Sequence, residues 1–137
     1  MTDEATNPIV DEGWRSRVGQ TLDRQEVTRL LGLTAQQLDA HARTGDILAL
    51  PFSDTSIYPV WQFDTATNPP SVRPITLEIV TVFREALDEV SPYTVAAWAT
   101  SPQPELSDRP PAEWIVSDGR SAPIAIAAQR AAQLEAT

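Results

Sequence analysis

The chain has 137 residues, a formal net charge of −9 and no cysteine. This length suits one domain or two very small ones, and the lack of cysteine excludes disulfides and thiolate metal sites. Apolar residues make up 42% and charged residues 21% of the chain, which is typical of a globular protein. No apolar run approaches the roughly 20 residues that span a bilayer, and the acidic start "MTDE" is unlike a signal peptide. We therefore expect a cytoplasmic protein without a membrane partner.

The charge is unevenly distributed along the chain. Residues 1–13 hold four acids and no base, which predicts a disordered acidic tail. Residues 14–50 hold five arginines against four acids, whereas residues 51–137 hold five arginines against eleven acids. Because proteins that bind nucleic acid usually carry a basic face, only residues 14–50 are candidates for one. All ten basic residues are arginine, which suits phosphate and guanine, although a biased genome composition explains this equally well.

The first elements expected after the tail are short helices. A helix is expected over residues 14–20, where two apolar residues lie one turn apart. The next segment, "LDRQEV", has the signature of a helix start, with Asp23 as the N-cap and Glu26 three residues later to close a capping box. Gly32 is a suitable residue to end this helix.

The same signature occurs a second time. Thr34 is the expected N-cap of the next helix, Gln37 closes its capping box, and Gly45 ends it. Residues 47–60 then alternate apolar and polar around the turn "SDTS", which predicts a β-hairpin. Two short helices joined by a glycine-containing turn and followed by a hairpin predict a winged helix-turn-helix over residues 14–66.

The second of these helices is the expected DNA-reading element. Leu38 and Ala42 are expected to face the core, and the polar residues between them to face outward. Glutamine can read adenine, and arginine can read guanine or bind phosphate. The expected DNA-binding residues are Arg24, Arg29, Thr34, Gln36, Gln37 and Arg43. Asp39 on the same face argues against tight binding, because it repels phosphate. The alternative is that both helices serve only as core, with their polar residues facing water.

The second half of the chain is expected to be a small helical bundle. The proline-rich segment "DTATNPPSVRP" precedes it, and a helix over residues 75–90 carries apolar residues over a broad arc. That arc favours a homodimer. Three further helices are expected at "TVAAWAT", "PAEWIV" and "SAPIAIAAQRAAQLEA". The predicted fold is therefore mainly α: a helix-turn-helix with a small β-hairpin wing, followed by a small helical bundle.

Catalysis has little support in this sequence. The single histidine, His41, lies inside a predicted helix and is interpreted as a surface or packing residue. No acidic pair has a supporting base or metal ligand, and no phosphate loop or catalytic motif is present. We expect no enzyme activity, no cofactor and no metal. Trp61, Trp98 and Trp114 are interpreted as core residues rather than partner-binding anchors.

The segment "SPYTVAAWATSPQPELSDRPPAEWIVSDGR" resembles the toxin-binding domain of Xre/MbcA/ParS-type antitoxins, over about residues 74–137. The resemblance rests on Ala97-Trp98, Ser101-Pro102, Leu106, Pro110-Pro111, Glu113-Trp114 and Asp118-Gly119. Ser107-Asp108 replaces the usual loop glycine, and Pro110 replaces the usual threonine cap. The segment "LDRQEVTRLLGLTAQQLDAHARTGDILAL" resembles the MerR or excisionase type of winged helix-turn-helix, with "YPVWQF" as the returning strand.

What this resemblance implies is the antitoxin of a type II toxin–antitoxin system. Such a protein neutralises a toxin by direct binding, here of the NAD-consuming RES type, and represses its own operon by binding operator DNA. The last helix is rich in alanine, so the residues expected to give toxin specificity are Gln129, Arg130, Gln133 and Glu135. The alternative is a stand-alone winged helix-turn-helix regulator in which residues 74–137 only dimerise the chain.

Overall fold

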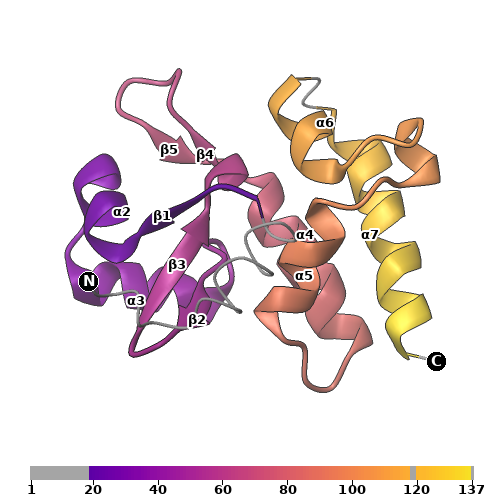
Figure 1. Ribbon diagram of the computed structural model, residues 1–137, viewed down its shortest axis with the longest axis horizontal. Coiled ribbons are helices and arrows are strands. Elements are labelled where there is room, and N and C mark those ends of the chain that lie inside the picture. The colour runs from indigo at the N-terminus through magenta and orange to yellow at the C-terminus, as the bar shows by residue number, and fades with distance from the viewer. Residues whose placement is uncertain (1–18, 118–119, 137) are drawn as a thin grey trace, which may run out of the picture.

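The computed structural model describes residues 19–117 and 120–136, and this part of the chain is mainly helical, as predicted. The helices are α2 (Arg24–Leu31), α3 (Ala35–Thr44), α4 (Ile75–Ala86), α5 (Pro92–Ala99), α6 (Pro111–Ser117) and α7 (Ser121–Ala136). The strands are β1 (Thr21–Asp23), β2 (Leu50–Phe52), β3 (Thr55–Pro59), β4 (Phe63–Asp64) and β5 (Ser71–Val72). Two single turns of 3₁₀ helix are η2 (Val60–Gln62) and η3 (Pro104–Leu106). Figure 1 shows α2, α3 and the strands on one side of the molecule and α5, α6 and α7 on the other, with α4 between them.

Both predicted capping boxes are confirmed. The Asp23 carboxylate accepts the Glu26 N–H at 2.7 Å, and Glu26 Oε1 accepts the Asp23 N–H at 2.8 Å. The same pair of contacts joins Thr34 and Gln37 at the start of α3, at 3.1 and 2.9 Å. Each box satisfies backbone N–H groups that have no partner inside the helix.

The two helices end where the glycines predict. Gly32 and Gly45 take φ values of 68° and 101°, in the left-handed region that favours glycine. Between them, α2 and α3 form a compact pair joined by a three-residue turn at residues 32–34. The tail at residues 1–13 lies outside the described residues. So does most of the expected helix at 14–20, and residues 19–20 are not helical.

The predicted hairpin is confirmed, and the structure adds a third strand to it. Strands β2 and β3 pair antiparallel, with Leu50 opposite Ile57. Strand β1 pairs with the other edge of β3, with Leu22 opposite Tyr58, so the sheet order is β1-β3-β2. A three-residue strand directly before a helix N-cap is too short to show period-two alternation, so β1 was not predicted.

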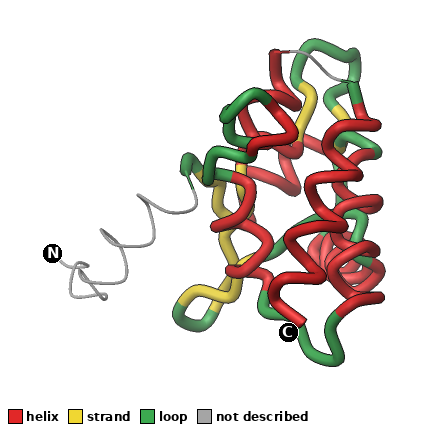
Figure 2. The backbone as a smooth tube through the Cα atoms, turned by 90° about the vertical axis from the view of Figure 1, so that its right-hand side faces the viewer, coloured by secondary structure: helices red, strands yellow, loops and turns green. Residues whose placement is uncertain are grey.

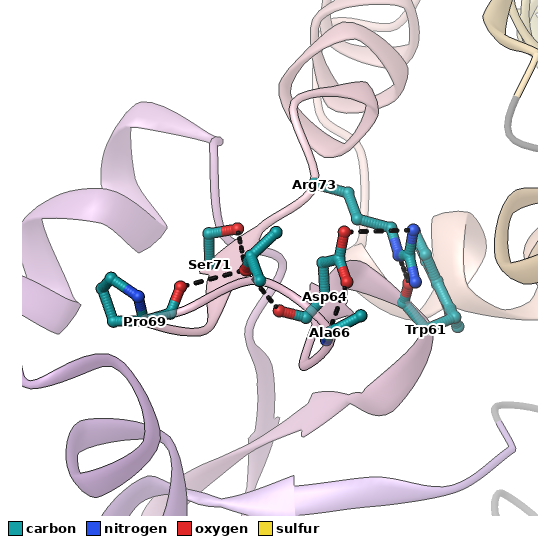
Figure 3. A network of polar contacts seen from close by, with 7 residues as sticks. Trp61, Asp64, Ala66, Pro69, Ser71 and Arg73 are labelled. Atoms are coloured by element: carbon teal, nitrogen blue, oxygen red, sulfur yellow. Dashed lines mark hydrogen bonds and ion pairs between the residues drawn. The ribbon is translucent and has the colours of Figure 1, made fainter.

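The proline-rich segment after the sheet is an ordered hairpin, β4–β5 (Figure 3). The Asp64 carboxylate accepts the Ala66 N–H, and the Thr67 hydroxyl lies 3.0 Å from the Ser71 hydroxyl. Arg73 Nε donates to the Trp61 carbonyl at 3.1 Å, which holds the base of this hairpin against η2. These polar contacts order the turn of the hairpin, while Phe63 of β4 is buried.

Two clusters of buried apolar side chains hold the chain together. The smaller one lies among α2, α3 and the sheet, and consists of Val27, Leu38, Ile47, Tyr58 and Phe63. The larger one fills the space between α4, α5, α6 and α7, and it also includes Leu48, Leu50 and Trp61 from the N-terminal half. Trp61, Trp98 and Trp114 are each 7% exposed within this cluster, as expected for core residues. The N-terminal elements are therefore packed onto α4 to α7, here called the helical half (Figure 2).

Helix α4 is shorter than predicted and better covered. It ends at Ala86, because Leu87 is extended, whereas the apolar pattern predicted a helix to residue 90. Ile79, Val80 and Phe83 are buried, and α7 packs along α4. Leu77 remains 41% exposed. The chain itself thus covers most of the apolar arc from which a homodimer was expected. Within residues 19–117 and 120–136, no helix has the length and apolar character needed to cross a membrane.

Candidate nucleic-acid interface

Of the six predicted DNA-binding residues, Gln36, Gln37 and Arg43 lie on α3 and Thr34 is its N-cap, whereas Arg24 and Arg29 lie on α2. Leu38 is fully buried, and it anchors the inner face of α3 on the smaller cluster. Gln36, Gln37 and Arg43 are exposed, as expected for residues of the outward face. The β2–β3 hairpin projects from the body of the molecule (Figure 2).

The starts of α2 and α3 and the hairpin meet at one depression of about 420 Å³. Its lining comes from both helix starts and from the first residue of β3: Asp23, Arg24, Gln25, Thr28, Leu33, Ala35 and Thr55. Of the predicted DNA-binding residues, Arg24 lines this depression, and Thr55 is the residue that the hairpin contributes to it.

Asp39, expected to repel phosphate, is paired with an arginine within the protein. Arg24 binds it with both ends of the guanidinium group, through Nη1–Oδ1 at 2.6 Å and Nη2–Oδ2 at 2.9 Å. The hydrogen bond from Arg24 lowers the pKa of Asp39, and the same contact raises the pKa of Arg24. The charge that α3 shows to a phosphate at this position is therefore close to neutral. The pair also means that Arg24, expected to contact phosphate, is held by Asp39 between α2 and α3.

Thr34 and Gln37 both have a structural task in addition to their expected one. Gln37 Oε1 accepts the Thr34 N–H, and Thr34 Oγ1 accepts the Gln37 N–H. Gln36 is exposed next to this box. Gln37 Oε1 therefore already accepts one hydrogen bond, which a base contact through Gln37 would have to share, whereas a contact through Gln36 leaves the box unchanged.

Two arginines and the histidine lie toward the ends of the helices. Arg29 is in the last turn of α2 and Arg43 in the last turn of α3, and both side chains are exposed. The His41 ring is a surface group, 43% exposed, whose Nδ1 lies 2.8 Å from a carboxylate oxygen of Asp46. This pair fastens the end of α3 to the segment that leads into β2.

The residues expected to bind a toxin lie on α7, on the other side of the molecule from α3 (Figure 1). Gln129, Gln133 and Glu135 are exposed. Arg130 is also exposed, but its Nη1 forms an ion pair at 3.1 Å with Glu105 of η3. The same helix exposes two large apolar side chains that the sequence did not single out, Ile126 at 57% and Leu134 at 62%.

Three side chains that the sequence did not single out hold α3 and the β2–β3 hairpin to the rest of the molecule. The Gln62 side chain is buried against Leu48 and Pro59, Arg84 contacts the end of α3, and Tyr93 contacts β2. Each partner lies beyond the range of local sequence rules or belongs to a different element.

Among the described residues, no group of three His, Asp or Glu side chains is placed to hold a metal ion. No protein-family profile, curated protein or solved structure matches this chain.

Proposed function

We propose that this protein is the antitoxin of a type II toxin–antitoxin system, with a DNA-binding N-terminal half and a toxin-binding C-terminal half. The observation that carries the DNA-binding part is the order of elements: two short capped helices, α2 and α3, followed directly by the β2–β3 hairpin. This order is that of a winged helix-turn-helix, in which the second helix enters the major groove and the hairpin lies beside it.

The charges of α3 are compatible with this role despite the acidic chain. Its one carboxylate, on Asp39, is neutralised by Arg24. The exposed Gln36 is suited to reading adenine, and the exposed Arg43 to binding a phosphate. Most of the net charge of −9 comes from other parts of the chain. Only a few arginine contacts are therefore available to bind the DNA backbone. We therefore expect modest affinity and a shallow salt dependence, with a slope of about 0.9 for each phosphate neutralised.

The toxin-binding part is supported by the outer face of α7 and by the resemblance of residues 74–137 to antitoxins. Exposed apolar side chains that occur next to polar ones are typical of partner surfaces, and Ile126 and Leu134 are of this kind. The assignment of a RES-type toxin depends on the resemblance alone. A homodimer remains part of the proposal, because helix-turn-helix proteins commonly read two half-sites.

A second candidate is a stand-alone winged helix-turn-helix regulator. It is favoured by the close packing of α4 on α7, because that packing gives α7 a structural role that needs no partner protein. The two candidates share the DNA-binding surface and differ only in whether α7 binds a toxin.

The DNA-binding part predicts that Arg43→Ala weakens binding to the promoter of the protein's own gene. If Arg43 neutralises one phosphate, the slope of log K against log salt should become shallower by about 0.9. Binding can be measured by fluorescence anisotropy between 50 and 300 mM salt. The matched control is Arg109→Ala in the helical half, which removes the same charge far from α3. Unchanged affinity and slope for Arg43→Ala would remove this residue from the interface.

The toxin-binding part predicts that Ile126→Glu and Leu134→Glu abolish neutralisation of the toxin encoded next to this gene. Both residues are mostly exposed, so the fold should be retained. Deleting α7 is not a suitable test, because Ile124, Ala127, Ala128 and Ala132 are buried in the larger cluster. The readouts are growth rescue on co-expression and circular dichroism of the purified variants. Val116→Glu on α6, where the side chain is 60% exposed, is the control. Full rescue by both variants would show that Ile126 and Leu134 do not contact the toxin, whereas failure of the unchanged chain to rescue growth would favour the stand-alone regulator.

A further inference from the structure

Helix α4, which belongs to the helical half, contacts the last turn of α3 through one side chain. Arg84 Nη1 lies 3.1 Å from the carbonyl oxygen of Arg43 and 3.1 Å from that of Thr44. These are the last two residues of α3, whose carbonyls have no partner inside the helix. A guanidinium group at this end also opposes the partial negative charge of the helix dipole. Arg84 therefore completes the C-terminal end of the proposed recognition helix from outside it.

Gly45 makes this approach possible. It has φ of 101° and its N–H donates to the His41 carbonyl, which closes the helix. A Cβ atom at Gly45 would lie 2.9 Å from Arg84 Nη1 and 3.0 Å from Val80 Cγ1. The backbone conformation favours glycine at this position, and an added Cβ would displace the Arg84 guanidinium group from the two carbonyls.

The hairpin is held by the same half of the molecule at a second point. The Tyr93 hydroxyl, in the first turn of α5, donates to the Pro51 carbonyl of β2 at 2.6 Å. Leu50, the first residue of β2, and Leu48, two residues before it, are buried in the larger cluster with residues of α4 to α7. The helical half therefore contacts both parts of the proposed DNA-binding surface.

We propose that Arg84 is a positioning residue for DNA recognition, which sets the placement of α3 relative to the hairpin from the helical half of the chain. The proposal rests on the proposed DNA-binding function and deepens it. Arg84 acts on DNA through the backbone of α3, so its loss moves the contacts made by Arg43 and its neighbours without removing a contact of its own. A shift of α4 caused by a bound partner would be transmitted to α3 through the Arg84 contacts.

The test compares Arg84→Gln and Arg84→Lys with the unchanged full-length chain. The probe is a DNA duplex that the unchanged chain enriches from a random-sequence pool. We expect Arg84→Gln to weaken binding by about fivefold to tenfold, within the usual range of coupling between two sites, with no change in the salt slope. We expect Arg84→Lys to restore part of the affinity, because it keeps a cationic donor near the two carbonyls. In an Arg43→Ala background the effect of Arg84→Gln should shrink, because both changes act on the same turn.

Three results would overturn the proposal. The first is an unchanged affinity for Arg84→Gln. The second is a salt slope shallower by about 0.9, which would make Arg84 a direct phosphate contact. The third is an effect of equal size in Arg109→Gln, an arginine of the helical half that contacts Glu113 and Ser117 instead of α3.

A measurement without DNA separates this proposal from the proposed function. Hydrogen exchange of the Gly45 and Ile47 amides, both bonded to the His41 carbonyl, should be at least several times faster in Arg84→Gln than in Arg109→Gln. Unchanged exchange would show that Arg84 does not hold the end of α3. If instead the exchange rises but the unchanged chain enriches no duplex, the DNA-binding function fails and the role of Arg84 in DNA recognition fails with it.

Discussion

Replacing Phe83 by alanine is expected to lower the free energy of unfolding by about 3–5 kcal/mol, the usual cost of deleting a fully buried aromatic ring. Phe83 is 0% exposed, and its ring meets that of Trp98 edge to face with centroids 5.5 Å apart. Both rings lie in the larger cluster, which joins α4 to the other helices of the C-terminal half. The cavity left by the ring has rigid helices around it and collapses poorly. Urea denaturation followed by tryptophan fluorescence and circular dichroism measures the loss.

Two companion variants make this result specific. Phe83→Leu keeps most of the apolar volume and should cost clearly less than Phe83→Ala. Leu77→Ala, on the same helix but 41% exposed, should cost no more than about 1 kcal/mol. If Phe83→Ala were as mild as Leu77→Ala, α4 would not be packed as described.

Replacing Gln62 by leucine is expected to cost about 3 kcal/mol or more, although leucine is similar in size and more apolar. The Gln62 side chain is 0% exposed. Its Oε1 accepts the Leu48 N–H at 2.7 Å, and its Nε2 donates to the carbonyls of Leu48 and Pro59 at 2.9 and 3.1 Å. Leucine would leave these three backbone groups buried without a partner, at about 1–3 kcal/mol each before the structure relaxes.

The measurement for Gln62 is again urea denaturation, with Gln25→Leu as the matched control. Gln25 is exposed on α2, so its replacement should change stability by no more than about 0.5 kcal/mol. Because Gln62 joins the segment before β2 to the end of β3, its loss should also increase amide exchange in the hairpin. A neutral Gln62→Leu variant would mean that water or a shifted backbone replaces all three contacts.

The sequence predicted those features of the fold that depend on neighbouring residues. Asp23 with Glu26, and Thr34 with Gln37, are three residues apart, so their capping boxes could be recognised without knowledge of the fold. The same holds for Gly32 and for the hairpin turn. The spacing of apolar residues alone, however, did not predict the end of α4, which lies before Leu87. Leu87 and Val90 pack on the core from a non-helical segment, so they keep the apolar character of a helix face without being helical.

The candidate site was predictable in outline only, for a related reason. The outward face of α3 follows from its own period, but the pairing of Arg24 with Asp39 spans 15 residues and two helices. The contact of Arg84 with α3 spans about 40 residues, and that of Tyr93 with β2 spans 42. Such contacts depend on how the two halves pack, and no local rule gives that. On α7, the many alanines leave the helical period weak, so the outward placement of Ile126 and Leu134 was not apparent.

The Tyr93–Pro51 contact has a further consequence for how the protein behaves in a crowded cell. Strand β2 is an outer strand of the three-stranded sheet, and such strands can recruit a strand of another chain and start aggregation. At the middle of β2, however, Pro51 has no N–H to donate, and its carbonyl accepts the Tyr93 hydroxyl. This edge therefore offers an incoming strand neither a donor nor an open acceptor at Pro51. We expect the sheet to resist extension from one molecule to the next along β2.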